Sequence, residues 1–321
     1  MRGASVAVVT RSAVYALPWP CAEPPGPRTY EARYEAEGVR FLAAGRSFDV
    51  VAGECGAVCF LRPGTSNALV GGIEQPIECM LVLQEDPPEL LVGTVDARLY
   101  RLVGGTARRV ESFHALECRS EWHTPWGGPP SVRSLAATMD GWVYADIHVG
   151  SIMRSSDRGE NWQPVTPELH EDVHQVATTP AAPDRVYANT AAGVYVSEDR
   201  GETWHHRAED LGCRYGRAMA PSPEDPDLLL ATVSDGPHGD DVHGQLWRSE
   251  DCGRSWTHVC GGFPDSTPEN INTHHVVFSP GGPAWALAGG AVYAGHERAT
   301  RWEQVWQPPE PPLMLAAPLA G

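Results

Sequence analysis

The sequence predicts an all-β fold built from one repeated unit of short strands, and three observations support this. First, the 321 residues include 33 Gly and 29 Pro, too many for a protein of long helices. Second, a hydrophilic octapeptide occurs three times, as SSDRGENW from Ser155, SEDRGETW from Ser197 and SEDCGRSW from Ser249. Third, an apolar run precedes each copy, and its aromatic or Met residue always stands nine residues before the closing Trp.

The nine-residue spacing identifies a degenerate fourth copy, AVYAGHERATRW, in which Glu297 stands where the others have Asp. The apolar run alone recurs three more times toward the N-terminus. The seven anchor residues of these runs are Tyr15, Cys59, Tyr100, Met153, Tyr195, Trp247 and Tyr293. Successive gaps of 44, 41, 53, 42, 52 and 46 residues are typical of four-stranded propeller blades. The sequence therefore predicts a seven-bladed β-propeller that forms a single domain over residues 1–321.

The same spacing places the other strands of each antiparallel blade. Before the anchor strands of blades four to seven lie the second strands WVYAD, RVYAN, LLLAT and AWALA, each preceded by an inner strand. The N-terminal segment SVAVVTRSAVYAL supplies a second and a third strand but no inner one, whereas the C-terminal LMLAAPLAG resembles the missing strand. We expect the C-terminal strand to pair into the first blade and close the ring.

The octapeptides have the composition of tight turns between the third and fourth strands. Backbone amides of the turn can donate hydrogen bonds to the preceding Ser hydroxyls and to the carboxylates of Asp157, Asp199 and Asp251. The Gly allows a positive φ. The closing Trp then packs between neighbouring sheets. We interpret these three Asp residues as structural.

The motif S-x-D-x-G-x-[TSN]-W resembles the Asp-box, or BNR repeat, of sialidase-like and sortilin-like propellers. The resemblance implies the propeller fold and covers nearly the whole chain. It implies little about activity, because the same fold carries many unrelated functions.

Charge and hydropathy restrict the possible partners. The formal charge of −17 repels phosphate backbones, so we expect no nucleic-acid partner. The apolar run near the N-terminus is too short for a signal peptide, and no later segment is long enough to span a bilayer. The sequence therefore predicts a cytoplasmic protein without a membrane partner.

In an antiparallel blade, the connections into the inner strand and those between the second and third strands share one face, opposite the octapeptides. Arg133, His174, Arg217 and His274 stand at equivalent positions near the start of four successive inner strands. Gln175 and His275 alternate with their neighbours, so either His of THH could point inward. Further candidates on this face are Asp146, His148, Tyr215 and Asp235.

Three functions fit this set of side chains. In the first, His148, His174 and His274 bind one divalent metal (Zn, Mn, Fe or Ni) with help from Asp146 or Asp235, as in a metal-assisted hydrolase or lyase. In the second, Arg133 and Arg217 clamp a small acid or acidic sugar, and a His acts as general acid or base. In the third, the protein is a scaffold whose protein partner sits across the channel mouth.

Sialidase chemistry, which the resemblance suggests, is disfavoured. Family members begin an arginine triad with an Arg-Ile-Pro segment that this sequence lacks, and LRPG at Arg62 is a poor substitute. Tyr215 in CRYGR has no evident Glu partner for the nucleophile role. The sequence thus favours a small polar, anionic ligand at the channel mouth, with His174, His274 and Arg217 as candidate catalytic residues and Arg133, Asp146, Tyr215, Gln175 and Asp235 as binding residues.

Overall fold

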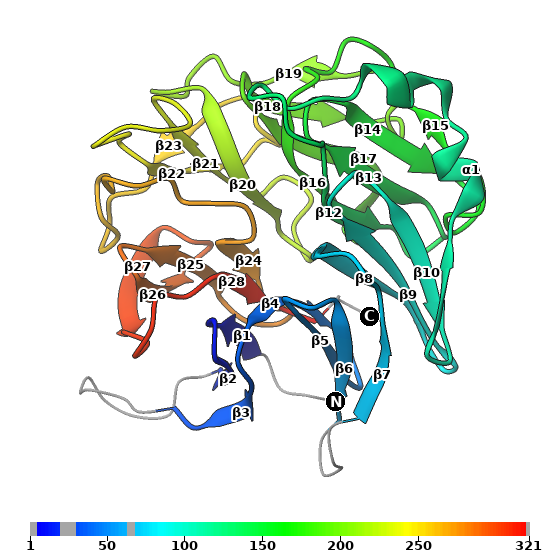
Figure 1. Cartoon of the computed structure of the whole chain (residues 1–321). Helices are drawn as coiled ribbons and strands as arrows, with labels where there is room; N and C mark the ends of the chain where they lie inside the picture. The colour runs from blue at the N-terminus through cyan, green and yellow to red at the C-terminus, as the bar shows by residue number, and fades with distance from the viewer. Residues whose placement is uncertain (1–4, 20–29, 63–67, 319–321) are drawn as a thin grey trace.

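The computed structural model describes residues 5–19, 30–62 and 68–318, and this part of the chain forms seven four-stranded antiparallel sheets in a ring (Figure 1). The fold class is therefore the predicted seven-bladed β-propeller. From the centre outward, blades one to three are formed by β28 (Met314–Ala316), β1 (Ser5–Val9), β2 (Ala13–Pro18) and β3 (Ala32–Glu35); β4 (Val39–Ala44), β5 (Asp49–Gly53), β6 (Ala57–Leu61) and β7 (Ala68–Gly72); and β8 (Ile77–Glu85), β9 (Pro88–Thr94), β10 (Leu99–Val103) and β11 (Thr106–Arg109).

Blades four to seven follow the same order. They are formed by β12 (Val132–Ala137), β13 (Val143–Ile147), β14 (Ser151–Ser155) and β15 (Gln163–Pro164); β16 (Val173–Thr179), β17 (Ala182–Thr190), β18 (Gly193–Ser197) and β19 (His205–His206); β20 (Tyr215–Pro221), β21 (Leu229–Ser234), β22 (Gln245–Ser249) and β23 (Thr257–His258); and β24 (Val276–Phe278), β25 (Ala284–Ala288), β26 (Ala291–His296) and β27 (Arg301–Trp306). Each inner strand contacts the inner strands of both neighbouring blades, so the seven surround one central channel.

The ring closes through the C-terminal strand, as predicted. In Figure 1 the red β28 lies beside the blue β1, and the antiparallel register pairs Ala7 with Ala316 and Val9 with Met314. The backbone N–H of Leu315 also donates to the carbonyl of His274 at 2.9 Å, so β28 is joined to blade seven as well. The two ends of the described chain are thus held within one blade.

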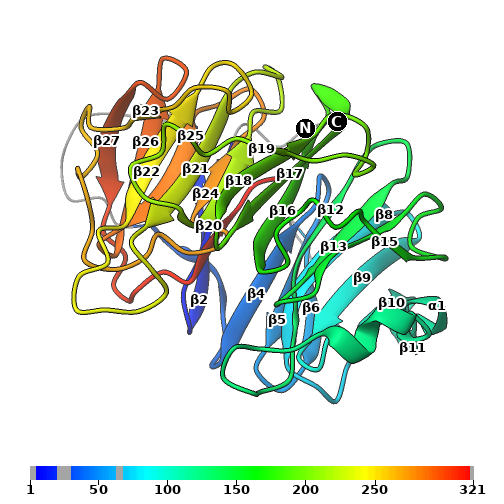
Figure 2. The same cartoon turned by 90° about the horizontal axis from the view of Figure 1, so that it is seen from above.

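In the described part of the chain, helical structure is confined to the connection between blades three and four. It comprises α1 (Glu111–His114) and the 3-10 turn η1 (Glu117–Glu121), and α1 lies at the outer edge of the ring (Figure 2). Within the residues that the structure describes, no helix is long and apolar enough to cross a membrane.

The octapeptides form the turns between the third and fourth strands of blades four to six. In blade five, Asp199 Oδ1 accepts hydrogen bonds from the Ser197 hydroxyl and the Thr203 amide, both at 2.8 Å, and Oδ2 accepts from the Thr203 hydroxyl at 2.6 Å. Gly201, at φ +87°, donates to the Ser197 hydroxyl at 2.7 Å. The corresponding Asp157 and Asp251 turns repeat these contacts.

The fourth copy folds into a different turn. Glu297, Arg298 and Ala299 all adopt positive φ values, of 50°, 60° and 61°. The indole N–H of Trp302 nevertheless donates to the Ala299 carbonyl at 2.9 Å, as that of Trp162 donates to Gly159 in blade four. The position of the closing Trp is therefore retained although the Asp contacts are not.

Candidate functional site

A group of polar side chains gathers on the face opposite the octapeptide turns, at the channel mouth of blades four to six. We call this group the mouth cluster. Its members are Arg133 of β12, His148 of the β13–β14 loop, Asp172 just before β16, His174 of β16, and Tyr215 and Arg217 of β20. Each inner strand or inter-strand loop places one or two of these side chains at the same end of the channel.

His174 lies at the centre of the mouth cluster and is fully buried. Its Nδ1 contacts the backbone carbonyl of Gly216, which can only accept a hydrogen bond, so Nδ1 carries a proton. In the neutral ring Nε2 is then an acceptor, and the Tyr215 hydroxyl lies 3.3 Å from it. Burial lowers the pKa of His174, although the neighbouring Asp172 acts in the opposite direction. The neutral ring is thus a proton acceptor near neutral pH.

Asp172 is the carboxylate of the mouth cluster. Its Oδ1 lies 3.3 Å from His174 Nε2, 3.6 Å from an Arg133 guanidinium nitrogen and 4.0 Å from His148 Nε2. Burial alone would raise the pKa of Asp172, but the protonated form of His174, through a hydrogen bond and its charge, and the charge of Arg133 outweigh burial and lower it. Despite these neighbours, Oδ1 is buried without a hydrogen bond of acceptable geometry. Asp172 therefore presents an ionised oxygen that lacks a donor.

Arg217, in contrast, has a buried hydrogen-bond donor without an acceptor. Its guanidinium stacks over the Tyr215 ring at 5.0 Å, and its Nε is buried without a hydrogen-bond partner. In the described part of the chain, no carboxylate lies within ion-pair distance of it. Buried polar atoms in native proteins are normally paired with protein groups or ordered water. The mouth cluster therefore holds a donor that lacks an acceptor beside an acceptor that lacks a donor.

His148 and Arg133 complete this surface. Burial lowers the pKa of His148 to about 4, and the charge of Arg133 adds to the effect, so its ring is neutral at pH 7. Arg133 donates to the carbonyl of Val173 at 3.0 Å, which ties β12 to blade five. The charge of Arg133 is balanced by Asp172 beside it. Arg217 has no such carboxylate among the described residues, so the cluster carries an excess of positive charge.

Asp146 lies in the core of blade four behind this surface. Its Oδ1 accepts from the Ser134 amide at 2.5 Å, its Oδ2 has no partner, and the side chain is fully buried. Burial raises the pKa of Asp146 to about 7, with Arg133 opposing. Asp146 acts on the cluster through its charge and not through direct access.

Gln175 and His274 line the central channel, in a cavity of about 220 Å³. The Gln175 side-chain amide donates to the carbonyl of Met219 at 3.1 Å and its oxygen accepts from the His274 amide at 3.2 Å, so Gln175 links β16 to β20 and to the segment just before β24. Of the two His residues in THH, His274 packs edge-on against Phe41 at 5.2 Å, whereas His275 Nε2 lies 3.2 Å from the Leu313 carbonyl. Burial lowers the pKa of His274 to about 4.

The residues expected to bind a metal are only partly brought together. His148 and His174 share Asp172, while His274 faces Phe41 and Asp235 contacts Cys213 and His243, at 3.0 Å and 2.7 Å. Among residues 5–19, 30–62 and 68–318, no group of three or more His, Cys, Asp or Glu side chains is arranged to hold a metal ion. The metal hypothesis therefore gains no geometric support from the described residues.

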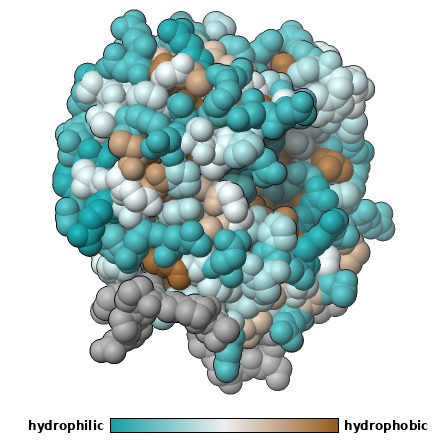
Figure 3. Space-filling view, turned by 90° about the vertical axis from the view of Figure 1, so that its left-hand side faces the viewer, coloured by the Kyte–Doolittle hydropathy of each residue, from teal (hydrophilic) through white to brown (hydrophobic). Residues whose placement is uncertain are grey.

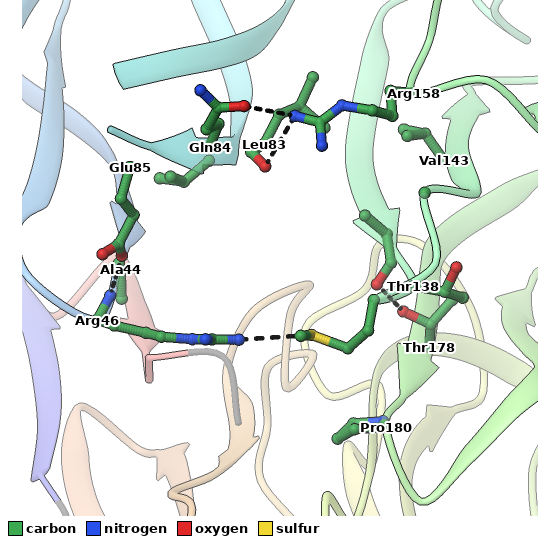
Figure 4. A pocket seen from close by; sticks show the side chains of 15 residues that line it. Ala44, Arg46, Leu83, Gln84, Glu85, Thr138, Val143, Arg158, Thr178 and Pro180 are labelled. Atoms are coloured by element: carbon green, nitrogen blue, oxygen red, sulfur yellow. Dashed lines mark hydrogen bonds between the residues drawn. The ribbon is translucent and has the colours of Figure 1, made fainter. Parts of the chain in front are cut away.

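A second cavity, of about 370 Å³, opens on the octapeptide face among blades two to five (Figure 4). The charged side chains Glu85 and Arg158 that line it already form hydrogen bonds with neighbouring protein groups. The Glu85 carboxylate accepts from the Ser47 hydroxyl at 2.7 Å and from the Arg46 amide. Arg158 points toward Leu83 and Gln84 and donates to them at 3.4 Å and 3.3 Å. We therefore regard the mouth cluster as the better candidate site.

Two members of this surface were not predicted from the sequence. Asp172 lies two residues before His174, in a connection that is not part of the repeat pattern. Trp126, in the long connection before β12, is 68% exposed, and its ring lies 4.8 Å from that of His148. The run WHTPW between two polar segments was the available signal for Trp126.

Comparisons with known proteins agree with a propeller of BNR-like type. A family model described as Sortilin, neurotensin receptor 3 (Sortilin-Vps10) matches residues 150–263, less than half of the chain. A xyloglucanase of Acetivibrio thermocellus is 27% identical over 210 residues, which cover 51% of this chain but only 24% of that protein. The aligned region thus spans about a quarter of that relative's length.

Solved structures give the same fold. The GH74 xyloglucanase from Xanthomonas campestris superposes with a TM-score of 0.67 at 15% identity, over 98% of this chain and 52% of its own. The structure described as YCF48 bound to D1 peptide gives a TM-score of 0.55 at 14% identity, over 89% of this chain and 91% of its own. At these identities the likeness shows the fold alone.

Proposed function

We propose that this chain binds a small sugar acid or hydroxy acid at the mouth cluster. The single observation that carries the proposal is the pair of buried atoms without a hydrogen bond, Arg217 Nε and Asp172 Oδ1, of which, among the described residues, only Asp172 Oδ1 has a charged neighbour, Arg133 at 3.6 Å. A carboxylate satisfies the guanidinium, and a hydroxyl on the same ligand satisfies the Asp172 oxygen, because a hydroxyl can donate where a carboxylate cannot. A ligand that carries both groups can therefore form a hydrogen bond with each of the two atoms.

The relatives support a saccharide as the first ligand class to test. Two proteins that align with this chain carry the name xyloglucanase, although each alignment covers only part of their length. Tyr215 and neutral His148 add polar groups around the two partnerless atoms, as sugar hydroxyls require. An acidic sugar combines the carboxylate that Arg217 requires with the hydroxyls that Asp172 requires.

Binding is better supported than hydrolysis of a glycoside. Glycosidases commonly use two carboxyl groups that flank the scissile bond, one as acid and one as base or nucleophile. The cluster offers ionised Asp172, but Asp146, the other carboxyl that the charge of Arg133 affects, is fully buried. His174 remains the candidate general base, because its neutral Nε2 faces the Tyr215 hydroxyl. Tyr215 therefore pairs with a His and not with a Glu.

The scaffold alternative would require a partner surface at the mouth. Figure 3 views the ring from the side that lies on the left in Figure 1, and this side is covered mainly by hydrophilic residues with small brown patches. Interfaces of obligate complexes are usually more apolar than this. This side therefore does not suggest a protein partner. At the mouth, the two buried atoms without hydrogen bonds make a small ligand the first hypothesis to test and a protein partner the second.

The test is calorimetric titration with glucuronic and galacturonic acids and with their neutral analogues glucose and galactose. We expect the acids to bind and the neutral sugars to bind at least about tenfold more weakly, because a hydrogen bond to a charged group contributes about 1.5–3 kcal/mol. In Arg217→Gln this preference for the acids should disappear.

Arg214→Gln is the matched control. Arg214 precedes β20 and is exposed, so this variant removes the same charge from the same segment without touching the cluster. Equal loss of acid binding in both Arg variants would indicate a general charge effect, and equal binding of acids and neutral sugars by the parent protein would contradict the proposed site.

A further inference from the structure

An exposed indole stands at the rim of the mouth cluster. Trp126 is 68% exposed, and among the described residues it is one of only four large apolar side chains that are strongly exposed. Its ring meets that of His148 at 4.8 Å with an interplanar angle of 66°, an edge-to-face arrangement that joins Trp126 to the cluster. A single exposed apolar side chain is common, but Trp126 contacts His148 of the mouth cluster, and Trp is enriched at binding surfaces because it combines an apolar ring with a polar N–H.

The loop that carries Trp126 is anchored on both sides. Trp122, four residues earlier, is buried against Phe113, and the Arg119 guanidinium lies 4.6 Å from its ring centre. The amide of His123 donates to the Val149 carbonyl at 3.3 Å, and that of His148 donates to the Ser131 carbonyl at 3.1 Å. The loop is therefore fixed to the same β13–β14 connection that presents His148.

The backbone beside the indole forms a tight turn. The Thr124 hydroxyl donates to the Gly128 carbonyl at 2.7 Å across this turn, in which Gly127 has φ +80°. A Cβ at Gly128 would lie 3.1 Å from the indole Nε1 of Trp126, so a side chain at this position would crowd the ring. The turn is thus ordered by its own hydrogen bond and leaves room for the indole, which stays open to solvent.

We propose that Trp126 forms a second, sugar-ring subsite, and that the ligand is an acidic oligosaccharide whose neutral unit stacks on this indole. The inference rests on the proposed function for the acidic unit at Arg217. His148 and Asp172 lie between Trp126 and the His174, Tyr215 and Arg217 part of the cluster. These contacts form a series from Trp126 through His148 and Asp172 to the Arg217 part of the cluster, which offers places for more than one sugar unit.

The surroundings favour a neutral sugar over the cationic ligands that an indole also binds. A cationic ligand would be attracted by the ring face, but the unpaired charge of Arg217 and that of Arg133 repel it. The C–H faces of a pyranose instead pack on the indole while its hydroxyls reach His148 and Asp172.

The test compares three probes by calorimetry: glucuronic acid, the disaccharide of glucuronic acid linked to xylose, and neutral xylobiose. We expect the acidic disaccharide to bind the parent protein about three- to tenfold more tightly than glucuronic acid, the gain typical of one aromatic contact. Trp126→Ala should remove this gain and leave the affinity for glucuronic acid unchanged, and Trp126→Phe should restore most of it.

Met139→Ala is the matched control, because Met139 is 63% exposed but lines the cavity on the opposite face. It should leave every affinity unchanged. Equal affinities of the two acids for the parent protein, or an unchanged gain in Trp126→Ala, would overturn the subsite.

Failure of the acid site would give a different result. If glucuronic acid does not bind and Arg217→Gln changes nothing, yet xylobiose binds in a Trp126-dependent way, then the sugar-ring subsite stands and the proposed acid site is wrong. If none of the three probes binds, the subsite is overturned together with the acid site.

Discussion

At the residue scale, Asp146 is a buried carboxyl with one hydrogen-bond donor for its two oxygens. Burial raises its pKa to about 7 from an ordinary value of 3.8. The folded chain thus holds this proton more tightly than the unfolded chain does. The contribution of Asp146 to stability is complete below about pH 4 and is lost as the pH rises through 7.

Asp146→Asn should remove this loss, because the amide is neutral at every pH and can still accept from Ser134. The free energy of unfolding of the variant, relative to the parent protein, should rise between pH 4.5 and pH 8 by at most about 4 kcal/mol. Urea unfolding at both pH values measures the difference. The exposed Asp240→Asn should give a difference that does not change with pH, and a similar flat result for Asp146→Asn would show that Asp146 is ionised throughout.

Side chains that follow the repeat could be placed from the sequence, whereas their roles at the site stay predictions. Arg133, His174 and Arg217 occupy equivalent positions on successive inner strands, so aligning the strands was enough to bring them together. His274 shares that sequence position, but its φ of +63° and its contact with Phe41 place it in the channel. Asp172 could not be found in this way, because it precedes the strand in a connection that the repeat does not constrain.

At the element scale, the three octapeptide turns each concentrate several hydrogen bonds on one carboxylate. Asp199→Ala should lower the free energy of unfolding by about 1–3 kcal/mol, because the amide and hydroxyl of Thr203 and the hydroxyl of Ser197 lose their acceptor. Urea unfolding followed by tryptophan fluorescence measures the loss, and binding at the mouth, on the opposite face, should remain unchanged.

Glu297→Ala provides the comparison within the same molecule. Glu297 occupies the corresponding turn of blade seven, but its side chain is 68% exposed and lies 3.8 Å from Arg301, a weak surface pair. Its removal should change stability by less than about 0.5 kcal/mol. A loss as large as that of Asp199→Ala would mean that the acidic residue stabilises this turn through contacts other than those of the octapeptides.

The strands were more predictable than their connections for a physical reason. All seven anchor residues lie on third strands, because hairpin pairing is local and each blade must bury an alternating apolar face. The connection between blades three and four obeys no such period. It folds into α1, η1 and the Trp126 loop, whose anchors, such as Trp122 and the β13–β14 loop, are contacts with other segments that only the folded chain provides.

At the scale of the whole molecule, the ring is closed by a strand of three residues, β28. Leu315 in this strand is 1% exposed and belongs to the apolar cluster that includes Val8 of β1 and Trp285 of β25. One side chain therefore joins the N-terminal, C-terminal and seventh-blade segments. The closure was predictable because the N-terminal segment lacked an inner strand and the C-terminal segment resembled one.

Leu315→Ala should consequently destabilise the entire propeller. A buried Leu→Ala change typically costs about 2–5 kcal/mol, whereas Leu313→Ala, two residues earlier and 40% exposed, should cost less than about 1 kcal/mol. Because β28 contacts both β4 and β24, loss of its packing should shift a single unfolding transition that fluorescence and far-UV circular dichroism report at the same urea concentration. Equal losses in the two Leu variants would show that β28 does not secure the ring. Separate transitions in Leu315→Ala would show that blades one and seven unfold independently of the other five.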